Sequence, residues 1–84
     1  NNQMQSSNAV QPADWQITAN VKQIIMTNSS LSSSARMISV TTNNGIVLLT
    51  GVVQNRKEGE KVLRMIQDVA GVRGIDNHLT LANP

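Results

Sequence analysis

The feature that most constrains the fold is the turn sequence Asn43–Gly45, which separates two stretches with the pattern of β-strands. Across Ile38–Thr42, every second residue belongs to one face, which is the period of a half-buried strand. Asn-Gly is a strong signal for a tight hairpin, because a type I′ turn needs positive φ at both central residues. The segment Ile46–Val53 is apolar on both faces and rich in β-branched residues. The sequence therefore predicts a β-hairpin whose second strand is the middle of a small sheet.

The segment before the hairpin predicts a helix that begins around Pro12 and fades near Thr27. Proline suits the first turn of a helix, and Asp14 would lie near the positive end of its dipole. Apolar residues recur at helical spacing and define an expected buried stripe. These residues are Ala13, Ile17, Val21 and Ile24. The serine-rich stretch Ser29–Ala35 is expected to be a loop.

The segment after the hairpin predicts a second helix, from about Arg56 to Ala70. Asn55 is the expected N-cap, and Glu58 three residues later completes a variant of the capping box. Gly71 is expected to end the helix in a left-handed conformation. A third strand is then predicted by the alternation from Val72 to Leu81.

These elements give the order α-β-β-α-β and predict an α+β fold. A right-handed crossover through the second helix would make strands two and three parallel. The expected architecture is therefore two helices packed on one face of a small three-stranded mixed sheet. Residues 12–82 are expected to form a single domain, and the polar residues 1–11 a disordered tail or linker cut from a longer parent. The interior must be aliphatic, because Trp15 is the only aromatic residue among the 84.

The sheet face away from the helices is the first candidate surface. Ile46, Leu48 and Val52 would lie on it, and Met37 is assigned to the same face. These side chains are more apolar than contact with solvent requires. We expect them to be covered by a neighbouring domain, by the tail or by a partner protein.

The outer side of the first helix is the second candidate surface. Trp15, Lys22 and Met26, with Ala19, are spaced i, i+7, i+11 and i+4, on the side expected to lie opposite Ile17. Tryptophan favours the headgroup zone of a membrane, and lysine attracts anionic lipid. The alternative is that Trp15 folds back over the edge of the core, or packs on the tail or on a partner.

Catalytic and metal chemistry find little support in this sequence. The chain has no cysteine and one histidine, His78, which could meet Asp76 two residues away on the same strand face. Scattered acids and one histidine do not make a metal site, and no cofactor is expected. The motif Gly71–Gly74 spells the Gly-x-x-Gly of a nucleic-acid clamp, but helix capping and a turn explain its glycines. No nucleic-acid partner is expected.

Four short motifs together resemble the BON domain (bacterial OsmY and nodulation) family. They are Asp14-x-x-Ile17-x-x-x-Val21, Ile38-x-Val40, Asn44-Gly45-x-Val47-x-Leu49-x-Gly51-x-Val53 and Val69-x-Gly71-Val72-x-x-Ile75-x-Asn77-x-Leu79-x-Leu81. The match spans Ala13 to Leu81. Within this pattern, Gly51 is expected to leave room for a close approach to the sheet. Asn77 is expected to point inward, as a buried amide that ties the strand to a neighbouring loop.

The resemblance implies a non-enzymatic module of the bacterial cell envelope, located in the periplasm and associated with the outer membrane. Members are linked with phospholipid surfaces, osmotic stress, lipoproteins and secretion assemblies. The leading expectation is a weak contact between anionic phospholipid headgroups and the first helix through Trp15, Lys22 and Met26. The alternative is an assembly module that meets other envelope proteins or a tandem domain. It would use the outer sheet face, at Ile46, Leu48 and Val52, or an exposed strand edge.

Overall fold

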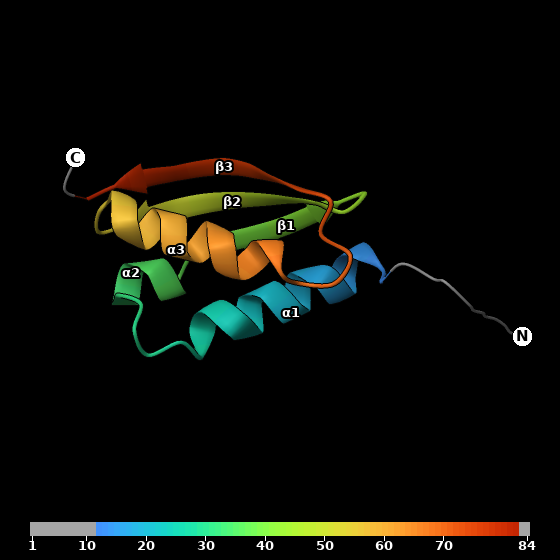
Figure 1. The fold of residues 1–84 in the computed structure, drawn as a ribbon, viewed down its shortest axis with the longest axis horizontal. Helices are drawn as coiled ribbons and strands as arrows, with labels where there is room; N and C mark the ends of the chain where they lie inside the picture. The colour runs from blue at the N-terminus through green and yellow to red at the C-terminus, as the bar shows by residue number, and fades with distance from the viewer. Residues whose placement is uncertain (1–11, 83–84) are drawn as a thin grey trace, which may run out of the picture.

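The computed structural model describes residues 12–82, so the expected tail at residues 1–11 lies outside the described part. The helices are α1 (Asp14–Met26), α2 (Ser33–Arg36) and α3 (Arg56–Gln67). The strands are β1 (Ser39–Asn43), β2 (Ile46–Val53) and β3 (Gly74–Leu81). The helices lie together on one face of the sheet (Figure 1). The α+β class and the order α-β-β-α-β are confirmed, with α2 as a short addition.

The sheet has the strand order β1-β2-β3, so the strand that is apolar on both faces is central, as predicted. β1 pairs with β2 antiparallel, and β2 pairs with β3 parallel. The crossover from β2 to β3 runs through α3 (Figure 1). Among the strands of residues 12–82, the mixed sheet therefore has two free edges, one along β1 and one along β3.

The hairpin turn is the one that the Asn-Gly pair predicts. Asn44 has φ of 52° and Gly45 has φ of 82°, the two positive values that a type I′ turn requires. The Asp14 carboxylate accepts the backbone N–H of Asn44 at 2.8 Å and that of Gly45 at 3.0 Å. The first turn of α1 is thereby fixed to the hairpin.

The core lies between the sheet and the helices and is aliphatic, as composition requires. Its fully buried large side chains are Ile17, Val21 and Ile25 of α1, Val47, Leu49 and Val53 of β2, and Val62 and Ile66 of α3. The predicted α1 stripe was wrong in two members. Ala13 is exposed because it is the extended N-cap residue, to which helical spacing does not apply. Ile24 is only half-buried, and Ile25 completes the buried row.

The segment expected to be a loop, Ser29–Ala35, contains most of α2. Ser32 caps this helix, because its hydroxyl accepts the N–H of Ala35 at 3.3 Å. Ala35 and Leu31 are both buried and fasten the segment to the core. Its 4 residues are too few to show a helical period, which is why the sequence pattern missed it.

The start of α3 follows the prediction and its end does not. Asn55 caps the helix by accepting the N–H of Glu58 at 3.0 Å. The helix ends at Gln67, with Asp68 as the C-cap, instead of continuing to Ala70. Gly71 lies beyond the helix end with φ of 91°. The turn that contains Gly71 passes close to α1, where a Cβ at Gly71 would lie 2.9 Å from Cδ1 of Ile17.

Candidate functional surfaces

The outer stripe of α1 is oriented by a hydrogen bond between Thr18 and Thr42. Their hydroxyl oxygens lie 2.7 Å apart and join α1 to β1. Lys22 and Met26 follow Thr18 at i+4 and i+8, so they continue the same ridge of the helix. The stripe therefore faces the side of the molecule where β1 forms the sheet edge, and not the side directly opposite the core.

The side chains of the stripe are open to solvent. Trp15 is 73% exposed and Met26 is 60% exposed, and Lys22 is also exposed. Trp15 therefore does not fold back over the core edge formed by the described residues. A large indole and a thioether on the same side of a rigid helix form an amphipathic surface with a lysine between them.

Two residues that sequence reasoning did not assign to this surface extend it. A cavity of about 350 Å³ between α1 and the segment that joins α2 to β1 is lined by Lys22, Ile25, Met26, Arg36, Met37 and Ile38. Arg36 adds a second cation beside Lys22. Met37, which the sequence assigned to the outer sheet face, lines this cavity and is 81% exposed. Ser32, a preferred N-cap residue, is a signal for the start of α2, but no sequence signal places Arg36 beside Lys22.

The charge of this surface is positive. Asp14 and Lys22 are the charged side chains of α1, and the Asp14 carboxylate is occupied by the two hairpin amides. Lys22 and Arg36 line the cavity together, and no acidic residue lines it with them. The surface can therefore attract an anionic group while its methionines and tryptophan offer apolar contact.

Within residues 12–82, nothing covers the outer sheet face, because the helices pack on the other side (Figure 1). Ile46, Leu48 and Val52 are 41%, 36% and 39% exposed along the central strand. The predicted contact between Asp76 and His78 forms on this face, with an oxygen-to-nitrogen distance of 2.9 Å. Both side chains of that pair are more than half exposed, so the pair belongs to a solvated surface.

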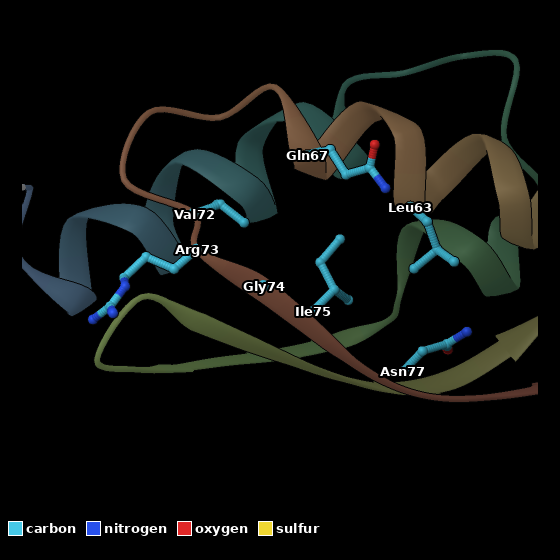
Figure 2. Close-up of a pocket in the computed structure, with 7 residues that line it drawn as sticks. All are labelled: Leu63, Gln67, Val72, Arg73, Gly74, Ile75 and Asn77. Atoms are coloured by element: carbon cyan, nitrogen blue, oxygen red, sulfur yellow. The ribbon is translucent and has the colours of Figure 1, made fainter.

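A groove that the sequence did not predict runs between α3 and β3. Figure 2 shows its first part, a cavity of about 370 Å³. That cavity is lined by Leu63, Gln67, Val72, Arg73, Gly74, Ile75 and Asn77. A second cavity of about 170 Å³ shares Leu63 and Asn77 with it and reaches Leu81. The two cavities follow β3 along its whole length.

Asn77 corrects an expectation taken from the family pattern. It was expected to be buried and tied to a loop, but it is exposed. Its side-chain oxygen accepts the N–H of Leu79, two residues later on the same strand, at 2.9 Å. The reason is that β3 lies at the sheet edge, where the inward-facing positions are only partly covered: Ile75 and Leu79 are half-buried, and Asn77 between them is exposed. Gly51 was expected to leave room for a helix side chain or to mark a bulge, but the close neighbour is Ile38, just before β1, whose Cα would lie 3.2 Å from a Cβ at Gly51.

Across residues 12–82, no three histidine, cysteine or acidic side chains gather where they could hold a metal ion. Within the same range, none of the helices is long and apolar enough to cross a membrane.

Known proteins share this fold and this sequence pattern. A solved structure of CdsD, a structural protein of the type III secretion system of Chlamydia trachomatis, shares the fold with a TM-score of 0.62 and 21% sequence identity. The alignment covers 84% of this chain and 32% of the CdsD chain, so the protein spans about a third of that chain. No curated protein matches the sequence. The family model of the BON domain matches residues 13–83, and the chain therefore belongs to the BON domain family.

Proposed function

We propose that this BON domain is a non-enzymatic binding module of the bacterial cell envelope that contacts anionic phospholipid headgroups. The contact surface is the outer stripe of α1, Trp15, Lys22 and Met26, extended by Arg36 and Met37. The observation that carries the proposal is the 73% exposure of Trp15 on the same side of the helix as a lysine and an exposed methionine.

The physical argument combines two weak attractions. Each lysine or arginine near an anionic membrane surface contributes roughly 1 kcal/mol. Tryptophan favours the interface because its ring is apolar and its N–H can still reach water or a headgroup. α1 has 13 residues and is about 20 Å long, which limits the apolar area that one domain can insert. The affinity of one domain is therefore weak, and it would rise steeply if two copies or a lipid anchor acted together.

Co-sedimentation with vesicles tests this proposal. The wild-type chain is expected to sediment with vesicles rich in phosphatidylglycerol but not with pure phosphatidylcholine, and less so as salt rises. The double variant Trp15→Ala, Lys22→Glu is expected to remain in the supernatant with an almost unchanged melting temperature. Lys57→Glu, on the exposed face of α3, is the matched control for the change in charge and should still sediment. Equal sedimentation of the double variant and the wild type would overturn the proposal.

A second candidate function is assembly with another envelope protein through the outer sheet face. It is favoured by the uncovered row Ile46, Leu48 and Val52, and by the fold shared with a structural protein of a secretion system. Leu48→Lys would then abolish the association and leave vesicle binding unchanged. Residue-resolved NMR shifts separate the two functions, because lipid should shift α1 and a protein partner should shift β2.

A further inference from the structure

β3 is an edge strand of 8 residues that buries none of its side chains. Its residues on the helix side are Ile75, Asn77, Leu79 and Leu81, which range from half-buried to exposed. The equivalent positions of β2, Val47, Leu49 and Val53, are fully buried. The core is therefore complete under β2 but left open under β3.

The backbone of β3 is open along the same edge. Ala82, just after the strand, donates its N–H to Val53 of β2 at 2.8 Å. Backbone groups alternate in direction along a strand, so the even-numbered residues of β3 face β2 and the odd-numbered ones face the free edge. The residues that offer free N–H and C=O groups are thus the same ones whose side chains line the groove. An added strand would gain backbone hydrogen bonds and apolar contacts together.

Asn77 blocks part of this edge. Its side-chain oxygen accepts the N–H of Leu79, one of the backbone donors that an added strand would need. Proteins commonly protect edge strands from unwanted pairing with local devices of this kind. The asparagine is exposed, so its side chain can rotate away without disturbing the core.

The groove selects the chemistry of the strand that would occupy it. Leu63, Val72 and Ile75 give it an apolar floor (Figure 2). An arginine stands at each end. Arg73 comes directly before β3, with its side chain extended past the hairpin turn, and Arg56 lines the far cavity with Leu81. Glu60 lines the far cavity with Arg56, and Asp14 lines a neighbouring cavity with Arg73. Among residues 12–82 neither arginine forms a salt bridge, so the N–H groups of both guanidiniums can donate to a carboxylate of a partner.

We propose that the free edge of β3 and the α3–β3 groove bind an extended strand of a partner protein, apolar at alternate positions and acidic at both ends. The strand extends the sheet by β-augmentation, and Asn77 must release the N–H of Leu79 for it to enter. A second copy of this chain fits poorly. Antiparallel pairing of two β3 edges would bring Arg56 of one copy against Arg73 of the other, which places like charges together.

The test uses the full chain, labelled with ¹⁵N, and the peptide acetyl-Glu-Val-Thr-Val-Thr-Val-Thr-Glu-amide. The peptide is expected to shift the amides of Ile75, Asn77 and Leu79 and to slow hydrogen exchange at Leu79. Two controls carry N-methyl groups on the valines or on the threonines. One of them must lose binding, because only alternate N–H groups of an added strand face β3. Binding by both N-methylated peptides would exclude β-augmentation.

Variants test the block and the charges. Asn77→Ala is expected to tighten binding by about fivefold, because the N–H of Leu79 no longer has a competing acceptor. His78→Ala, on the outer face, is the matched control and should bind as the wild type does. Arg73→Glu should weaken binding and regain it with one of two peptides that carry lysine at a single end and glutamate at the other, because Arg56 is unchanged, whereas Arg64→Glu should not weaken it. The proposal fails if the Asn77→Ala variant does not bind the peptide at millimolar concentration. It also fails if the peptide shifts amides on the outer sheet face instead of β3, or if the variant dimerises through β3. Vesicle binding through α1 is a separate measurement, so either proposal can fail alone.

Discussion

The carboxylate of Glu58 accepts both the backbone N–H and the hydroxyl of Ser32, each at 2.8 Å, and so joins α3 to the cap of α2. The same carboxylate accepts the backbone N–H of Gln54 at 2.8 Å. Glu58 therefore links the start of its own helix to a segment 26 residues earlier in the chain. It was expected to complete a capping box, yet its carboxylate bonds to Gln54 and Ser32.

This arrangement predicts a stability that depends on pH. Burial raises the pKa of Glu58, but the hydrogen bonds from Gln54 and Ser32 and the charge of Lys61 outweigh it and lower the pKa below its ordinary value. A group whose folded pKa is lowered stabilises the fold above its unfolded pKa of about 4.3, and this contribution is lost as pH falls through the folded pKa. We expect the melting temperature of the wild type to fall between about pH 5 and pH 3. Glu58→Gln should be less stable at neutral pH by about 1–2 kcal/mol and show a smaller acid-dependent drop.

The control for that experiment is Glu60→Gln, two residues along the same helix and exposed. It should leave both the stability at neutral pH and the acid-dependent drop close to those of the wild type. A drop that is equally large in Glu58→Gln and the wild type would show that another group is responsible. The measurement is thermal unfolding followed by circular dichroism across the pH range.

A matched pair of glycine substitutions tests where backbone freedom is required. Gly71 has φ of 91°, and a Cβ there would lie 2.9 Å from Cδ1 of Ile17 and 3.0 Å from Cδ of Pro12. Gly71→Ala should therefore destabilise the protein by at least about 2 kcal/mol. Gly59 lies inside α3, where a Cβ would meet only Val53 at an ordinary distance of 3.4 Å. Gly59→Ala should stabilise by about 0.5–1 kcal/mol, as urea titration can measure. Equal effects of the two would contradict the role given to Gly71.

The parts of the fold that could be predicted are those whose causes are local. Asn44 and Gly45 determine the turn type by their backbone preferences, and Asn55 caps α3 by a contact three residues away. The end of α3 could not be predicted in this way. Gly71 reads as a helix cap in sequence, but its positive φ serves the approach to Ile17, which is distant in the chain.

The candidate surfaces also divide into features with local causes and features that depend on tertiary packing. The exposure of Trp15 and Met26 agrees with helical spacing, although the sequence left open that Trp15 folds back over the core edge, and their use in lipid contact stays a prediction. The neighbourhood of Arg36 could not be read from spacing, because it depends on how α2 packs beside α1. Asn77 was misplaced because alternation alone does not tell an edge strand covered by a helix from one left open.

Two adjacent leucines test the assignment of the sheet faces. Leu49 is fully buried, whereas its neighbour Leu48 is 36% exposed on the outer face. Leu49→Ala should cost about 2–5 kcal/mol of stability, because it leaves a cavity in the core. Leu48→Ala should cost less than about 1 kcal/mol. Urea unfolding of the two variants measures both values, and similar losses would mean that the outer face is covered in solution.

Asp14 offers a test of how α1 is held against the hairpin. Asp14→Ala removes the carboxylate that accepts the N–H groups of Asn44 and Gly45. It also removes the acidic residue from the first turn of α1. Hydrogen bonds to charged groups contribute about 1.5–3 kcal/mol each when buried, and these are partly exposed, so we expect a total loss of about 2 kcal/mol. The amide of Gly45 should exchange faster with solvent, whereas that of Val62 in α3 should change only with global stability. Asp68→Ala, an exposed acid at the end of α3, is the control. If Gly45 exchanged no faster in Asp14→Ala than in that control, the carboxylate would not be what fixes the hairpin to α1.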